Sequence, residues 1–241
     1  MGTVSINEQR RTGFTFLQIL EGLEGLLIIL TAYLSFFLKP LRDRWGMSRK
    51  EANSLFPGDH LVSQPRSEFV HAIEINAPAS FVWPWIAQIG QGKGGFYSYE
   101  ALENMVGLKI YNADKILAEF QQPQIGDLIS FGPKDAYPIV IYEPGKSIAI
   151  ENWYDLNKNS VYNQALESPI NYLHLSWLWM VESIDENRSR FISRNRVDFS
   201  PSFKNSLMFG PLGEPIVFAM DRKMCYGIKR RAENLYKTKL Q

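Results

Sequence analysis

Three glycines in the stretch GQGKGG, residues 90–95, have the spacing of a phosphate-binding turn. Gly90, Gly92 and Gly95 read G-x-G-x-x-G. Asp114 follows after about 20 residues, where a carboxylate would contact a ribose. In a dinucleotide-binding fold this turn follows a strand and opens a helix, but here the preceding residues have a helical period. We therefore expect no nucleotide, no nucleic acid and no cofactor as partners.

Polar side chains around the same glycine loop could carry acid–base chemistry. Glu103 could exchange a proton at the polar end of a cavity, and Tyr97 is a second catalytic candidate. Gln88 and Tyr99 join Tyr97 as candidates for ligand binding. The structural alternative, which we favour, is that these groups tie two short helices to a sheet, because buried polar groups usually serve structure.

Three arginines fall on one face of an expected strand. Arg190, Arg194 and Arg196 are spaced by a period of two. Arg194, with its neighbours, could hold an anionic headgroup or carboxylate through charge-assisted hydrogen bonds. The alternative is a solvated outer face of the sheet.

Aromatic and methionine side chains could line an apolar pocket, because methionine adapts to varied shapes. The alternative is that they fill an ordinary core, and both interpretations stay open. The residues concerned are Trp85, Trp153, Trp177, Trp179, Met220 and Met224.

The composition suits one large domain with a substantial core. The chain has 241 residues, of which 45% are apolar and 13% aromatic, and its formal net charge is +1. Cys225 is the single cysteine, which excludes an internal disulfide and favours a reducing compartment. His60, His71 and His174 stand alone in sequence, so we expect structural histidines and no metal site.

An apolar segment near the N-terminus is long enough to cross a bilayer. Residues 13–38 exceed the ~20 residues that a spanning helix needs, although Glu21 and Glu24 interrupt them. We favour a membrane anchor, and the alternative is a helix that docks on the domain or lies in the interface. Basic residues after the segment outnumber those before it, which places the C-terminal domain in the cytoplasm. They are Lys39, Arg42, Arg44, Arg49 and Lys50, against Arg10 and Arg11.

The remaining chain predicts an α+β plan of antiparallel strands and a long C-terminal helix. Strands are expected at residues 68–76, 128–131, 138–142, 147–151, 172–183 and 188–199. Helices are expected at residues 81–89, 99–107 and 214–236. Ser80 is the expected N-cap of the first helix, and Pro84 is expected to kink it. Asp221 and Arg231 are expected on the polar side of the last helix.

We divide the chain into three parts. Residues 1–47 form the hydrophobic segment, residues 48–67 a linker, and residues 68–241 the ligand-binding domain. The sheet and the long helix can each present an apolar face, so a cavity between them is the natural ligand site.

The chain also resembles the helix-grip superfamily of START-type lipid-transfer proteins, polyketide cyclases and pollen-allergen-like proteins, in particular an uncharacterised bacterial membrane-tethered branch. The resemblance covers residues 69–233. It is carried by PGD at 57–59, INAP at 75–78, VWPW at 82–85, QIGQGKGGFYSY at 88–99, LEN at 102–104, GD at 126–127, SR at 193–194 and the helix at 220–233. It implies a curved antiparallel sheet wrapped around the C-terminal helix and a ligand cavity, but no particular reaction.

Three functions fit this sequence. The first is a membrane-tethered module that binds or transfers a lipid or another apolar small molecule. The second is a cyclase- or dehydratase-like enzyme that uses polar cavity residues. The third is a structural or interaction module without a ligand.

Overall fold

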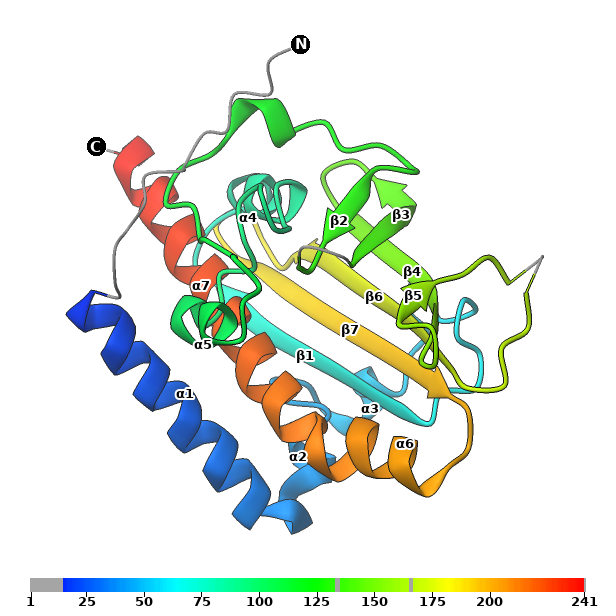
Figure 1. Cartoon of the computed structure of the whole chain (residues 1–241). Helices are drawn as coiled ribbons and strands as arrows, with labels where there is room; N and C mark the ends of the chain where they lie inside the picture. The colour runs from blue at the N-terminus through cyan, green and yellow to red at the C-terminus, as the bar shows by residue number, and fades with distance from the viewer. Residues whose placement is uncertain (1–14, 133–134, 165–166, 241) are drawn as a thin grey trace.

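The computed structural model describes residues 15–132, 135–164 and 167–240. Within them an antiparallel sheet, ordered β1-β7-β6-β4-β3-β2 with β5 paired to β4, packs against the long helix α7, Glu214–Leu240 (Figure 1). The α+β helix-grip architecture is therefore confirmed. The strands are β1 Ser67–Ile75, β2 Leu128–Ser130, β3 Ala136–Glu143, β4 Ser147–Asp155, β5 Ser160–Val161, β6 Tyr172–Ser183 and β7 Ser189–Phe199.

Both faces of β6 are buried, which explains its nearly continuous apolar sequence. Trp179 and Val181 belong to the core that also contains Met224 of α7. Leu178 and Met180 point the other way, into a second apolar cluster on the outer face of the sheet. The period-two side-chain pattern of a strand thus fixes which tryptophans face the helix.

The free edge of β1 is paired with the chain that precedes it. The backbone N–H groups of Val70 and Ala72 donate to the carbonyl oxygens of Asp43 and Trp45, at 2.7 and 2.9 Å. This pairing covers an edge that could otherwise associate with another chain.

The segment expected as a linker packs on the outer face of the sheet. Phe56 contacts the outer apolar cluster, which also includes Met47, and Val62 is buried. The division into domains stays a prediction, but residues 48–67 contribute packed side chains of their own.

The glycine turn follows a helix, as expected. Helix α4, Ala79–Ala87, ends shortly before Gly90, and helix α5, Glu100–Met105, begins after the turn. The expected cap of α4 is wrong: the helix begins two residues earlier, at Ala79, so Pro78 takes the N-cap position in place of Ser80.

Several short elements were not expected from the sequence. They are too short for hydrophobic periodicity to reveal them, since each covers about one helical turn or one strand pair. They are helices α2 Lys39–Arg42, α3 Arg49–Ala52 and α6 Phe203–Leu207, a π-helical turn Met208–Leu212 and strand β5. The structure also has a 3-10 turn at Ala118–Phe120.

Two charged residues expected on the polar side of α7 are buried instead. Asp221 and Arg231 both lie on the side of the helix that packs against the rest of the domain. The expectation failed because each side chain finds hydrogen-bond partners on a distant segment, which helical periodicity does not report.

Candidate functional site

A cavity of about 110 Å³ lies between the sheet and the start of α7. Its lining residues come from β1, β7, the π-helical turn, the first two turns of α7 and Asp43 in the segment before β1. The lining residues are Asp43, Ser67, Glu68, Phe69, His71, Asn195, Val197, Met208, Phe209, Gly213, Glu214, Val217 and Phe218. Most of the wall is apolar, so this space suits a small apolar molecule.

A buried histidine–carboxylate pair stands at this cavity. His71, which lines it, is 1% exposed, and its Nδ1 lies 2.5 Å from Oδ2 of Asp221 on α7. Asp221 Oδ1 accepts a hydrogen bond from Ser193 Oγ at 2.7 Å, and Ser193 Oγ accepts one from Trp177 Nε1 at 2.8 Å. The network joins α7 to β1, β7 and β6.

Sequence reasoning missed this pair because its members are far apart in the chain. His71 and Asp221 are separated by 150 positions, and a lone histidine on a strand carries no local signal. The sequence did contain one signal for a buried Asp221. It lies one turn before Cys225 and two turns before Ile228, and therefore on the apolar stripe of α7.

The candidate ligand residues from the sequence all lie outside the lining of this cavity. Trp85 and Met224 are core residues, and Trp153 stacks on His174 with ring centroids 3.6 Å apart. Trp177 is tied to the histidine network, and Met220 is half-buried. Their role in ligand binding stays a prediction.

The polar residues around the glycine loop bond to nearby backbone. Gln88 Oε1 accepts from the backbone N–H of Leu117 at 2.9 Å, and Tyr97 Oη donates to the carbonyl oxygen of Trp85 at 3.0 Å. Tyr99 packs inside, with the Lys223 ammonium 4.9 Å from its ring. These contacts match the structural alternative, while the catalytic roles stay predictions.

Burial raises the pKa of the Tyr97 and Tyr99 hydroxyls well above their usual range, and it also changes the acidity of Glu103. Its carboxyl is 5% exposed and accepts a hydrogen bond from Ser98. Burial raises the pKa of Glu103 to about 7, the Ser98 hydrogen bond opposes the rise, and the nearby Glu100 adds to it. Glu103 therefore holds its proton in the folded protein at pH values where an exposed carboxyl has lost it.

The conformation of the loop explains its glycines. Gly90, Gly92 and Gly95 have φ angles of 129°, 74° and 75°, a region that favours glycine. A Cβ on Gly95 would also lie 2.6 Å from Asn112 Oδ1. Asp114, the candidate ribose ligand, pairs with Arg231 of α7 at 2.7 Å. The absence of nucleotide binding stays a prediction.

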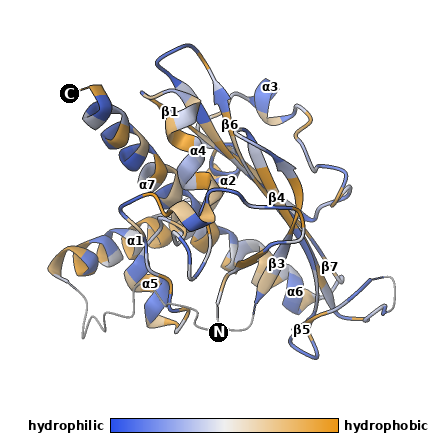
Figure 2. Cartoon of the chain, turned by 90° about the horizontal axis from the view of Figure 1, so that it is seen from above, coloured by the Kyte–Doolittle hydropathy of each residue, from blue (hydrophilic) through white to orange (hydrophobic). Residues whose placement is uncertain are grey.

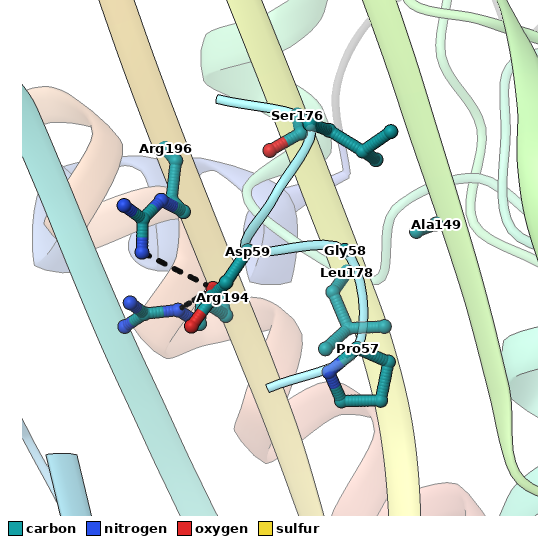
Figure 3. A pocket seen from close by; sticks show the side chains of 9 residues that line it. Pro57, Gly58, Asp59, Ala149, Ser176, Leu178, Arg194 and Arg196 are labelled. Atoms are coloured by element: carbon teal, nitrogen blue, oxygen red, sulfur yellow. Dashed lines mark hydrogen bonds and ion pairs between the residues drawn. The ribbon is translucent and has the colours of Figure 1, made fainter. Parts of the chain in front are cut away.

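The three arginines share the outer face of the sheet, but the expectation of a solvated face is wrong for Arg194 and Arg196, which are largely buried and paired with carboxylates. Figure 3 shows Asp59 between Arg194 and Arg196, with distances of 2.5 and 3.3 Å. Glu68 pairs with both, and Arg190 pairs with Glu51.

The space beside this arginine cluster is very small. The pocket between Pro57, Leu178 and Arg194 holds about 10 Å³ (Figure 3), about the volume that one water molecule needs. The PGD motif thus supplies the counter-charge for Arg194 from within the chain.

Helix α1, Phe16–Leu34, docks on α7 and α5 through its small and acidic residues. Gly22 and Gly25 are buried, and a Cβ on Gly25 would lie 2.8 Å from Leu102 Cδ1. Glu21 and Glu24 each pair with Lys223 of α7 at 3.1 Å. The two glutamates that interrupt the apolar segment are therefore those that face the domain.

The opposite face of α1 is apolar and exposed, and Figure 2 shows the hydrophobic colour recurring along the helix. Its exposed side chains are Phe16, Leu17, Ile19, Leu20, Leu23, Leu26, Leu27, Leu30 and Leu34. Among the described residues α1 is the one helix whose length and composition would allow it to cross a membrane, a test that a signal sequence also passes.

A second, more polar pocket of about 360 Å³ lies between α1, the α5 loop and α7. Its lining carries both charge signs, including Glu21, Glu100, Lys223 and Arg231. It reaches Thr15, the first described residue.

Comparison with known proteins gives structural matches only. No family model and no curated protein matches the sequence. A protein from Arthrobacter aurescens is 14% identical over 76% of this chain and 92% of its own, with a TM-score of 0.36. The ZhuI aromatase/cyclase from Streptomyces sp. R1128 is 12% identical over 73% and 96%, with a TM-score of 0.28. The KanY protein is 12% identical over 70% and 99%, with a TM-score of 0.32. At these scores the matches carry no argument about ligand or activity.

We predict that Asp59→Asn destabilises the protein. It removes the carboxylate that Arg194 and Arg196 share, and both guanidinium groups are largely buried. Loss of one partner of a buried ion pair lowers the free energy of unfolding by about 3–5 kcal/mol. We expect a value near the lower end, because Glu68 still pairs with both arginines. Urea denaturation measures it, with Glu143→Gln in an exposed pair as the control, expected to cost less than about 1 kcal/mol. Equal small effects in both variants would contradict the prediction.

We also predict that Glu103 makes the protein less stable as the pH rises. Between pH 4.5 and about 7 the folded protein binds the proton that the unfolded chain has released, so the free energy of unfolding falls by up to about 3 kcal/mol over this window. Urea denaturation at pH 5 and pH 8 should show this loss in the wild type and a smaller one in Glu103→Gln. Glu186→Gln, on an exposed turn, should behave as the wild type. The same pH dependence in all three proteins would rule out Glu103 as its source.

Proposed function

We propose that this protein binds a small apolar molecule in the cavity at the start of α7, while α1 holds it against a lipid bilayer. The observation that carries the proposal is the continuity between the cavity and the exposed apolar surface. Met208 and Val217 line the cavity and are 50% and 38% exposed. A molecule could therefore pass from an apolar phase into the cavity without crossing water.

The membrane-facing surface combines α1 with the segment that leads into α7. Tyr33, near the end of α1, donates a hydrogen bond from its hydroxyl to the carbonyl oxygen of Leu212, at 2.5 Å. Exposed apolar side chains on the second segment are Phe203, Leu207, Met208, Leu212, Ile216 and Val217. The Tyr33 hydrogen bond brings these two exposed apolar segments together, and large exposed apolar patches are typical of a membrane or protein contact.

The docked position of α1 favours a helix that lies in the membrane interface over one that spans the bilayer. Its neighbour α7 carries charges along its length, among them Arg222, Lys223 and Arg230, and these would be costly in hydrocarbon. With α1 against α7, one side of α1 stays on the domain and the other can enter the headgroup and acyl boundary. The cytoplasmic location of the domain stays a prediction from the basic residues after the helix.

The cavity volume suits a ligand about the size of a single ring. Apolar cavities of about 150 Å³ are known to bind benzene. The apolar walls contribute the binding free energy, at about 25 cal/mol per Å² of buried apolar surface. We therefore use toluene as the probe of this site.

We predict that toluene binds saturably to the full-length protein, as measured by its effect on methyl NMR signals. Val217→Trp should remove the binding, because the indole fills a cavity that Val217 lines. Ile216→Trp is the matched control, because Ile216 is the neighbouring residue on α7, is exposed, and lies outside the cavity lining. This variant should bind toluene as the wild type does. Unchanged binding in Val217→Trp would contradict the assignment of the site.

A flotation experiment tests the membrane contact. The full-length protein should float with phosphatidylcholine–phosphatidylglycerol vesicles. The triple change Leu23→Gln, Leu27→Gln and Leu30→Gln should lower partitioning at least about hundred-fold, since each buried leucine contributes about 1.5–3 kcal/mol. The control variant Ile125→Gln with Ile170→Gln removes two exposed apolar side chains elsewhere on the protein, and its partitioning onto vesicles should equal that of the wild type. A wild type that stays with the soluble fraction would refute the membrane contact.

A further inference from the structure

We propose that His71 is a general base whose Nε2 takes a proton from the molecule held in the cavity. The ligand class is a small apolar molecule with one weakly acidic C–H or O–H bond. This inference rests on the proposed ligand cavity and adds an activity to it.

The imidazole of His71 is surrounded by aromatic side chains. Phe69 stacks on His71 with ring centroids 4.2 Å apart, and Phe218 meets it edge-on at 5.5 Å. Trp45 contacts it edge-on at 6.3 Å. The ring is thus fixed between aromatic walls and belongs to the cavity lining.

The hydrogen bonds of the network fix the position of the proton on the ring. Trp177 Nε1 can only donate, so Ser193 Oγ accepts from it and gives its own hydrogen to Asp221 Oδ1. Asp221 is then an acceptor, and its other oxygen, Oδ2, accepts from Nδ1–H of His71 at 2.5 Å. In a neutral imidazole with the proton on Nδ1, the Nε2 atom carries the free lone pair.

This lone pair has no partner in the described part of the chain. His71 Nε2 is buried and makes no hydrogen bond to any of the residues that the structure describes. Leaving such an atom unsatisfied costs about 1–3 kcal/mol. A ligand in the cavity supplies the missing donor.

The acidic groups at the cavity differ from His71 in being paired already. Asp43 and Glu214 both bind Lys39, at 2.6 and 3.1 Å. Glu68 binds Arg194 at 3.0 Å. Of the titratable groups that line the cavity within the described residues, His71 is thus the one that is not held by a cation.

The chemistry is a proton transfer that needs no further reactant. The C–H or O–H bond of the ligand breaks, an Nε2–H bond forms, and the electron pair stays on the ligand. The resulting imidazolium lies against the Asp221 carboxylate, which stabilises it. Return of the proton to another ligand atom completes an isomerisation and regenerates His71. Positioned bases of this kind accelerate proton transfer typically by 10²–10⁴-fold.

Two variants separate this role from a structural one. In His71→Asn the amide N–H can keep the hydrogen bond to Asp221, while the atom that corresponds to Nε2 is gone. In Asp221→Asn the new amide donates to Nδ1 and so moves the imidazole proton to Nε2, which removes the lone pair but leaves the cavity in place. Each variant retains hydrogen bonds between α7 and the sheet.

The test uses 5-nitrobenzisoxazole, whose C3–H proton a base removes while the N–O bond breaks and the ring opens to a coloured cyanophenolate. With the full-length wild type we expect a saturable rate above buffer. Both His71→Asn and Asp221→Asn should lower kcat at least about hundred-fold and leave KM within a few-fold. Ile170→Trp, at an exposed side chain away from the cavity, should keep the wild-type rate, and thermal melts show that each variant is folded.

The outcomes distinguish the two proposals. Saturation with an unchanged kcat in His71→Asn would overturn the base assignment and leave the ligand cavity standing. If His71→Asn melts at a lower temperature than the wild type, Asp221→Asn takes its place in the test, and an unchanged kcat in Asp221→Asn would overturn the base assignment. A wild type that binds toluene but shows no saturable rate above buffer would refute the base and leave the cavity standing, whereas a wild type that does neither would refute both.

Discussion

Asp221 places a carboxylate inside the interface between α7 and the sheet, and the surrounding structure has to compensate for its burial. A charge removed from water is tolerated only when its oxygens are well satisfied. Here His71 on β1 and Ser193 on β7 occupy the two oxygens. Because these partners sit on neighbouring strands, the carboxylate fixes both the rotation of α7 and its position along the sheet.

Other features follow from that placement of α7. One turn after Asp221, Met224 enters the core, and Gly227 lies so close to the backbone of Tyr97 that a side chain would collide with it. Lys223, on the opposite side, is then directed to α1, where it meets Glu21 and Glu24. Toward its N-terminus, α7 stands away from β1 and β7 far enough to leave the apolar cavity. The anchoring carboxylate, the docked helix and the cavity are thus parts of one arrangement.

The parts of the fold that depend on local periodicity could be predicted from the sequence. The alternation in β6 and β7, the apolar stripe of α7 and the helix before Gly90 each repeat over enough residues to be recognised. The sites could not, because they depend on partners far apart in the chain. In the sequence Arg194 is a candidate for binding an anion, but in the structure it is paired with Asp59. His71 has no polar neighbour in the sequence, but in the structure it contacts Asp221. The sequence predicted a cavity between the sheet and the long helix, but it did not predict which residues line it, since the lining depends on how side chains from separate segments pack. The apolar segment predicted a long apolar helix, and α1 is such a helix, but only the paired glutamates show which side of α1 faces the domain.

The central claim is that the cavity at the start of α7 takes up a small apolar molecule from the membrane surface. Native mass spectrometry of the full-length protein, released from vesicles loaded with a mixture of small apolar compounds, tests it directly. The account predicts a one-to-one adduct on the wild type and on Ile216→Trp, and only the bare mass for Val217→Trp. A bare mass for all three proteins, or the same adduct on all three, would contradict it.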